Sequence, residues 1–95
     1  MKKPMVYVDF NEMLDSNLVL LSAHDTKTAA NGDVVSLYEG LEVVVYMDDT
    51  DNNGASDNLV AHGVVERNPS VAGWAAQVKW CCRIDGSGVR HESEL

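Results

Sequence analysis

Residues 74–84 read Trp-Ala-Ala-Gln-Val-Lys-Trp-Cys-Cys-Arg-Ile, the most regular pattern in the 95-residue chain. An apolar side chain occupies every second position, namely Trp74, Ala76, Val78, Trp80, Cys82 and Ile84. Successive side chains of an extended chain point to opposite faces, whereas a helix would spread these residues around its axis. The pattern therefore predicts a fully extended strand over residues 74–84, with both tryptophans turned toward a core.

Other segments continue the strand pattern on both sides of this stretch. Residues 41–47 and 59–65 have an apolar or small side chain at every second position, which predicts half-buried strands. Asn31-Gly32 indicates a hairpin, because a type I′ turn needs positive φ at both central residues, and residues 34–38 would be the return strand. Residues 89–92 follow a glycine-rich turn and predict a short last strand.

The N-terminal part is less regular. Asp9 and Glu12 are spaced as in a capping box, so residues 1–16 are predicted to form a short helix or turn, and residues 17–95 to form strands. The apolar run at residues 18–21 fits either a buried strand or the end of a helix, since so short a run has no decisive period. Whether residues 1–38 complete the strand assembly or lie outside it stays open.

The predicted strands indicate an all-β protein. The chain is shorter than the roughly 150 residues of a typical domain, so residues 1–95 form a single domain. Its fourteen valines favour strands, because β-branched side chains fit a pleated, half-buried surface. Closing a strand meander into a barrel removes its exposed edges. The polar loop at residues 48–58 cannot supply the helix of an OB-fold, so we expect a small SH3-like antiparallel barrel of five or six strands.

A resemblance extends this expectation over residues 40–95, whose turns and strands are similar to those of Tudor- and KOW-type SH3-like barrels. The matching stretches are Gly40-Leu41-Glu42-Val43-Val44-Val45, Ala61-His62-Gly63-Val64-Val65, Trp74-Ala75-Ala76-Gln77-Val78-Lys79-Trp80 and Asp85-Gly86-Ser87-Gly88-Val89. The resemblance implies a binding module. Tudor domains hold methylated side chains in an aromatic cage, but this chain has no matching set of aromatics, so that function is not carried over. A shared fold does not by itself transfer a function.

The charge balance narrows the class of partner. Seven Lys and Arg residues stand against fifteen Asp and Glu residues, a formal net charge of −8, and residues 1–60 carry all of it. A nucleic-acid partner is therefore disfavoured, because such binding comes from neutralising phosphates. The acidic part either keeps the protein soluble or steers a basic partner toward it.

The sequence has no recognisable signal for export or for membrane insertion, so the cytoplasm is the expected compartment. Cys81 and Cys82 are adjacent, and a disulfide between neighbours in an extended chain would be strained, which fits a reducing compartment. Acidic residues interrupt the region where the apolar part of an export signal would follow the N-terminal lysines. No apolar run approaches the roughly 20 residues that cross a bilayer. We expect a cytoplasmic protein that does not enter the membrane.

The candidate binding residues lie on the outer side of the predicted sheet. Lys79, Arg83 and Arg90 would form a basic strip there, and Tyr46 and His62 would join it if the register permits. Small barrels often bind partners on such a face. The alternative is that these cations only keep the face in contact with water. With the acidic first part, the strip would favour a protein partner or head-to-tail self-association.

One loop has part of a calcium-binding pattern. Oxygen-bearing side chains fall at alternate positions in Asp49, Asp51 and Asn53, a glycine follows, and Asp57 comes later. The position where a calcium loop places its bidentate glutamate holds Val60. Asp, Asn and Gly are also common in turns, which is the simpler explanation. No metal is favoured, and no cofactor is expected.

No catalytic set is apparent. Cys81 is expected on the polar face beside Lys79 and Arg83, where cations would lower the pKa of its thiol, while Cys82 is expected in the core. A nucleophile also needs a base and an orienting group, and the sequence assembles neither around Cys81. We therefore expect a non-catalytic binding or adaptor domain for a protein partner. The alternatives are a nucleic-acid-associated module of the KOW or Tudor kind and a weak calcium-binding loop protein.

Overall fold

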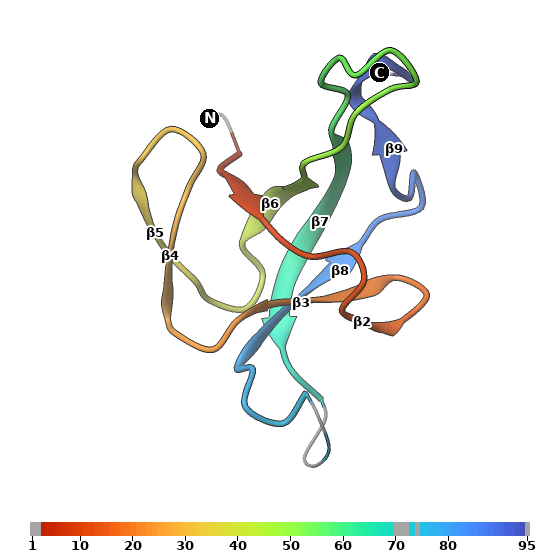
Figure 1. Ribbon diagram of the computed structural model, residues 1–95. Coiled ribbons are helices and arrows are strands. Elements are labelled where there is room, and N and C mark those ends of the chain that lie inside the picture. The colour runs from red at the N-terminus through yellow and green to blue at the C-terminus, as the bar shows by residue number, and fades with distance from the viewer. Residues whose placement is uncertain (1–2, 70–72, 74, 95) are drawn as a thin grey trace.

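The protein is all-β, as predicted. The computed structural model describes residues 3–69, 73 and 75–94. Within them it has nine strands and a single 3-10 turn, η1 (Glu92–Glu94) (Figure 1). The strands are β1 (Met5–Tyr7), β2 (Met13–Asp15), β3 (Leu18–Ser22), β4 (Thr26–Thr28), β5 (Val34–Ser36), β6 (Glu42–Met47), β7 (Leu59–Arg67), β8 (Trp80–Ile84) and β9 (Arg90–His91).

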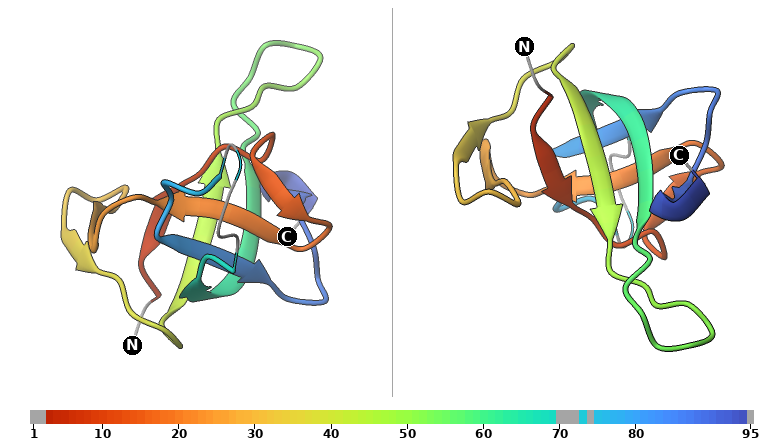
Figure 2. Two further views of the ribbon diagram at one scale, coloured as in Figure 1. Left: turned by 90° about the horizontal axis from the view of Figure 1, so that it is seen from below. Right: turned by 90° about the horizontal axis from the view of Figure 1, so that it is seen from above.

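The strands form one large mixed sheet and one small hairpin. The large sheet has the order β1-β6-β7-β8-β3-β2, with β9 paired to β7, while β4 and β5 pair only with each other. All pairs in the large sheet are antiparallel except β1 and β6, which are parallel. The sheet curls around the core but is open, with β1 and β2 at its ends (Figure 2). The predicted closed antiparallel barrel is thus not what forms.

The described part of the N-terminal segment forms two short strands joined by a turn, so of the predicted helix or turn only the turn is found. The Asp9 carbonyl accepts a hydrogen bond from the Glu12 amide at 2.9 Å, which closes a turn between β1 and β2. The predicted capping pair therefore belongs to a turn. β1 then lies beside β6, far along the chain, and a parallel pair of this kind needs a long crossover connection. The residues near β1 in the sequence therefore do not indicate that it pairs with β6.

Several predicted strands are confirmed. β6 and β7 match the predicted segments at residues 41–47 and 59–65 to within two residues, and the run at residues 18–21 lies in the buried strand β3. β9 lies within the predicted last strand. The hairpin at Asn31-Gly32 exists, and β5 pairs with β4, a strand that the sequence pattern did not single out. Gly32 has φ of 92° and Asn31 does not have positive φ, so the turn is not type I′.

The decisive stretch at residues 74–84 is only partly a strand. β8 starts at Trp80, whereas residues 75–77 form a turn, so the prediction of one extended strand is wrong for residues 75–79. Hydrogen bonds from the Ala76 amide to the Gly73 carbonyl and from the Val78 amide to the Ala75 carbonyl hold this turn. Trp80 is 6% exposed and lies in the core, as predicted. Trp74 is outside the described residues.

The main core lies on the inner side of the sheet. Alternate residues of β6 and β7 supply its centre, because side chains of one strand parity share a face. Its buried members are Val6, Val8, Val19, Leu21, Ala29, Leu37, Val43, Val45, Ala61, Val65, Trp80, Cys82 and Ile84. Leu37 and Ala29 attach the β4–β5 hairpin to this core. No helix in the described part of the chain is long and apolar enough to cross a membrane.

A second, smaller core lies on the outer side of β3 and β8. Leu18, Leu20, Ala75 and Cys81 are buried together there, with Leu14 and Val78 packed against them. The turn after Gly73 supplies Ala75 and Val78 and so folds over this part of the sheet. Cys81 is therefore fully buried, and its prediction as a residue of the polar face is wrong. Burial raises the pKa of the Cys81 thiol to about 11.

Candidate binding face

The outer side of β1, β6 and β7 carries an uncovered patch. Val43, Val45 and Ala61 point into the core, so the residues between them point outward. The strand register then aligns Met5 with Val44 and His62, and Tyr7 with Tyr46 and Val60. Residues opposite each other on neighbouring strands share a face. We call the following set the open face: Met5, Tyr7, Val44, Tyr46, His62 and Val64.

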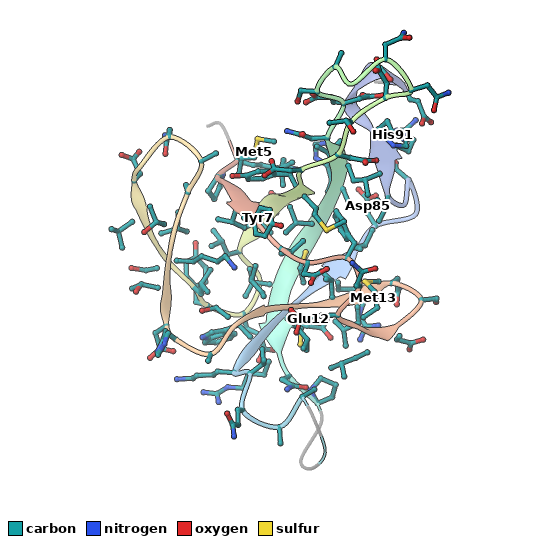
Figure 3. All side chains as sticks on the ribbon, in the orientation of Figure 1. Met5, Tyr7, Glu12, Met13, Asp85 and His91 are labelled. Atoms are coloured by element: carbon teal, nitrogen blue, oxygen red, sulfur yellow. The ribbon has the colours of Figure 1, made fainter. Side chains whose placement is uncertain are left out.

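Five of the six side chains of this open face are apolar or aromatic, and two of these five, Tyr7 and Val64, are exposed while the others are half-buried. Tyr7 is 42% exposed and Val64 is 40% exposed. The rings of Tyr7 and Tyr46 meet edge to face, with their centroids 5.5 Å apart. This contact ties the end of β1 to β6 and holds both phenol rings in one place. Met5 and Tyr7 are labelled on β1 in Figure 3.

Most of the predicted binding residues lie on or beside the open face. Tyr46 and His62 belong to it, and Arg90 pairs with Val60 at its β9 border. Arg83 is opposite Val64, at the border with the covered part of the sheet. Its guanidinium donates hydrogen bonds to Glu66 Oε1 at 2.7 Å and to Asn17 Oδ1 at 2.9 Å. The ion pair with Glu66 raises the pKa of Arg83 and compensates its charge.

Lys79 lies elsewhere, so the predicted basic strip does not form. It precedes β8, and its ammonium is 2.6 Å from Asp25 Oδ1. The Trp80 indole nitrogen donates to the same carboxylate oxygen at 3.0 Å. The hydrogen bonds from Lys79 and Trp80 lower the pKa of Asp25. Arg67 and Lys79 also lie over the Trp80 ring, at 5.4 and 5.6 Å from its centroid. Lys79 thus belongs to a cluster around Trp80.

Only Tyr46 and His62, two of the six open-face residues, were predicted as binding residues. Met5 and Tyr7 were expected in a helix or turn, and Val44 and Val64 were expected only as parts of strands. The useful signal was the alternation Met5-Val6-Tyr7-Val8, in which Val6 and Val8 are buried and the other two residues face outward. This alternation is too short to identify a strand without its partner.

The loop at residues 48–58 extends the β6–β7 hairpin. Thr50 and Ser56 form an isolated bridge across it. Asp51 Oδ1 accepts hydrogen bonds from the amides of Asn53 at 2.8 Å and Ala55 at 3.0 Å, and Gly54 has φ of 80°. These are the contacts of a tight turn stabilised by an aspartate side chain. The pattern of acidic and small residues thus has a local structural role.

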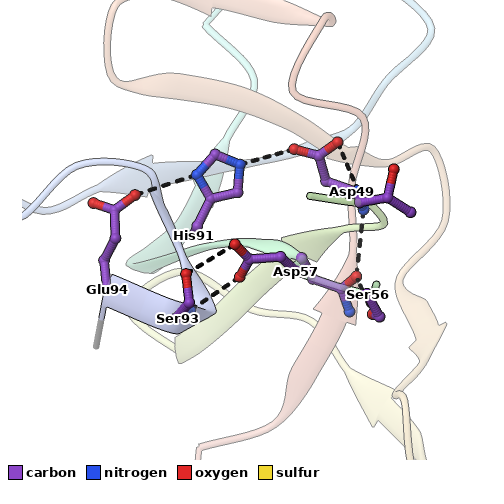
Figure 4. A network of polar contacts seen from close by, with 8 residues as sticks. Asp49, Ser56, Asp57, His91, Ser93 and Glu94 are labelled. Atoms are coloured by element: carbon purple, nitrogen blue, oxygen red, sulfur yellow. Dashed lines mark hydrogen bonds and ion pairs between the residues drawn. The ribbon is translucent and has the colours of Figure 1, made fainter. Parts of the chain in front are cut away.

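Two further carboxylates of this loop, those of Asp49 and Asp57, contact the C-terminal segment. Asp49 Oδ2 is 2.8 Å from His91 Nε2, and Asp57 accepts hydrogen bonds from the amide and hydroxyl of Ser93 at 3.0 and 2.8 Å (Figure 4). Glu94 contacts the second ring nitrogen of His91 at 3.2 Å. Asp49, Asp51 and Asp57 thus have different partners. No group of three His, Cys, Asp or Glu residues in the described ranges is arranged to hold a metal ion.

The same contacts bear on catalysis. The hydroxyl of Ser93 donates to Asp57, so it is not paired with His91 as a nucleophile would be with its base. Burial raises the pKa of Cys81 to about 11 and that of Cys82 to about 12, which keeps both thiols protonated at neutral pH. The described side chains therefore present no activated nucleophile at these positions.

No family model, curated protein or solved structure matches this chain.

Proposed function

We propose that this protein is a non-catalytic binding domain that docks a partner protein on the open face. One observation supports the proposal above all. The outer side of the sheet is covered over β3 and β8 by the turn at residues 75–78. Over β1, β6 and β7 the side chains of Tyr7 and Val64 stay exposed and those of Met5, Val44, Tyr46 and His62 stay half-buried, although Val60 is buried there. Exposed apolar patches that include tyrosine and methionine are typical of protein interfaces.

The charge distribution favours a partner with a basic surround. Lys3, Lys79 and Arg83 are each within 4.0 Å of a carboxylate of this chain, at 3.9 Å from Glu42 and at 2.6 and 2.7 Å from Asp25 and Glu66. Much of the small basic content is thus neutralised internally, and the formal net charge of −8 remains on acidic side chains. Such a field increases the rate of encounter with a cationic protein.

A nucleic-acid partner, which the KOW resemblance implies, has less support. Two of its three expected contacts, Lys79 and Arg83, form ion pairs within the chain, and Lys79 lies away from the other two. Binding to a phosphate backbone would have to displace these carboxylates. Fluorescence anisotropy with short RNA and DNA at low salt separates the two functions, because only the nucleic-acid module would bind with a steep salt dependence.

Affinity capture with paired variants tests the docking proposal. The open-face variant combines Tyr7→Ala with Val64→Ser, and the matched control combines Tyr38→Ala with Val34→Ser, which are 56% and 70% exposed elsewhere. Quantitative mass spectrometry compares the proteins that each bait retains. We expect a basic protein to be retained by the wild type and the control and lost from the open-face variant. Equal retention by both variants would refute docking on this face.

A further inference from the structure

The hydrogen bonds between β1 and β6 use the backbone groups on only one side of β1. The Val44 amide donates to the Pro4 carbonyl and the Val8 amide donates to the Tyr46 carbonyl, both at 2.9 Å. In a parallel pair the residue between these positions, Val6, also bonds to β6, and the alternate residues turn away from it. The backbone groups of Met5 and Tyr7 therefore point away from the sheet.

In β4, too, the backbone groups on only one side bond to the neighbouring strand, β5. The Ala29 amide donates to the Asp33 carbonyl and the Leu37 amide to the Asp25 carbonyl, both at 2.7 Å, so odd-numbered residues of β4 bond to β5. The backbone groups of Thr26 and Thr28 point the other way. Ala30 has their parity, and its amide donates to the Met5 carbonyl at 2.8 Å. The unused edge of β4 is thus turned toward β1.

These two edges meet at one end only. Beyond the Ala30–Met5 hydrogen bond, no described backbone group pairs with Tyr7, Thr26 or Thr28. We call the space between these edges the seam. Two unpaired strand edges that face each other can both accept an added extended chain, which is a common mode of peptide recognition. The β4–β5 hairpin stands beside β1 in both views of Figure 2.

A cavity at the open end of the seam adds a chemical preference. It has a volume of about 250 Å³, and Tyr7, Val8, Asp9, Glu12 and Lys27 are among its lining residues. The Lys27 ammonium donates to the Leu21 carbonyl at 2.7 Å, and burial lowers its pKa. Asp9 and Glu12 also line this cavity, so its lining has two acidic residues against the one ammonium of Lys27. In a chain of net charge −8, this end of the seam favours a cationic side chain.

We propose that an extended basic segment of the partner protein adds as a strand to the free edge of β1 in the seam. This inference rests on the proposed function, because Tyr7 contributes its side chain to the open face and its backbone to the seam. The added strand would bond to the Tyr7 amide and carbonyl and would place basic side chains near Asp9 and Glu12. Its apolar side chains would extend the open face past β1.

Amide exchange measured by NMR on the wild-type chain tests the seam directly. In the free protein we expect the Tyr7, Thr26 and Thr28 amides to exchange readily and the Val44 amide to be protected. The probe is a short synthetic peptide of alternating lysine and valine, compared with a glutamate–valine peptide of equal length. We expect only the lysine peptide to protect the Tyr7 amide.

A pair of variants separates the backbone from the side chain. Tyr7→Ala and Tyr7→Pro both remove the phenol ring, but only proline also removes the amide hydrogen that faces the seam. We expect the lysine peptide to bind Tyr7→Pro at least about tenfold more weakly than Tyr7→Ala. If Tyr7→Pro does not fold, the exchange experiment on the wild type decides alone.

Three results would overturn strand addition. The first is a Tyr7 amide already protected in the free monomer, because the seam would then be closed by the chain itself. The second is a lysine peptide that shifts the resonances of Val44, His62 and Val64 but leaves Tyr7 and Thr28 unchanged, which would leave docking on the open face intact. The third is a dimer in light scattering whose formation protects Tyr7, since a second copy would then fill the seam.

Discussion

The outer side of the large sheet has two parts. Both consist of side chains that point away from the main core, but only one part is covered by another segment of the chain. Over β3 and β8, residues 75–78 and β2 enclose Leu18, Leu20 and Cys81. Over β1, β6 and β7, side chains of similar apolar character remain at the surface, including Tyr7 and Val64. An apolar sheet face is therefore not evidence of a core unless another segment of the chain reaches it. Variants in the inner core, in the covered part and on the open face test this contrast.

Trp80→Ala sets the scale for a buried position. The indole is 6% exposed, and its removal is expected to lower the free energy of unfolding by about 3–5 kcal/mol. Lys79→Ala, next to it, removes an exposed ion pair with Asp25 and the contact of the ammonium with the Trp80 ring, and is expected to change stability by about 1 kcal/mol. Urea denaturation measures both. Similar midpoints for the two variants would mean that the faces of β8 are assigned wrongly.

Leu20→Ala and Val64→Ala compare the covered and the open part directly. Leu20 is buried in the second core, so its truncation is expected to lower the free energy of unfolding by about 2–5 kcal/mol. Val64→Ala, on the open face, is expected to stay within about 1 kcal/mol of the wild type. Thermal unfolding of the two proteins gives the comparison. An equal loss in both would show that the open face is covered in solution.

Gly63→Ala tests the spacing between β7 and β8 beneath both parts. A Cβ atom at this position would collide with the Cys82 sulfur and with the Arg83 carbonyl. Because one of these neighbours is backbone, the strands must move apart, and we expect a loss of about 1–3 kcal/mol. The matched control is Gly86→Ala, where a Cβ would meet no atom within 4 Å. Circular dichroism melting curves that coincide for the two variants would contradict the close contact.

The reactivity of the Cys81 thiol tests whether the covered part of the sheet is shielded from solvent. Its pKa of about 11 lies two units above the ordinary value of 9.0. The thiolate fraction at neutral pH is therefore about a hundredfold smaller than for an ordinary thiol, and alkylation by iodoacetamide should be slower by at least that factor. Mass spectrometry of native and urea-unfolded protein follows the reaction. Equal rates in the two states would show that the turn at residues 75–78 does not cover β8.

Substitution of His91, which lies in β9 at the border of the open face, is expected to have the smallest effect on stability. Hydrogen bonds to Asp49 and Glu94 raise its pKa above the ordinary value of 6.5. Its contribution to stability is therefore fully present below about pH 6.5 and is lost as the pH rises through the raised pKa. We expect His91→Gln to melt below the wild type at mildly acidic pH and with it at alkaline pH. A difference independent of pH would exclude this charge contact.

The strands that sequence predicted well are those whose environment alternates regularly. β6 and β7 have one face on the core along their length, so their period of two is preserved in the sequence. At residues 75–79 the same period is misleading, because the turn buries Ala75 and packs the half-buried Val78 against the outer side of β8. Burial there follows from a fold-back of the chain, which a local pattern cannot distinguish from a straight strand.

The candidate site shows the same limit. Tyr46 and His62 could be placed on an outer face because they belong to a long alternating strand pair. Arg83 lies at the border of the open face, as its place in β8 suggested. Lys79 lies elsewhere, because β8 begins only at Trp80. Tyr7 could not be found, since a three-residue strand has too few positions to show a period.

The sequence alone determined that the chain is a valine-rich all-β domain with an acidic surface and which residues of β6 and β7 face the core. These properties follow from composition and from side-chain alternation within single strands. Only the tertiary structure decided that β1 pairs in parallel with β6, that the sheet stays open, and which part of its outer side is covered. Pairing and coverage join segments that are distant in the chain, and their free energy depends on contacts that no local pattern contains.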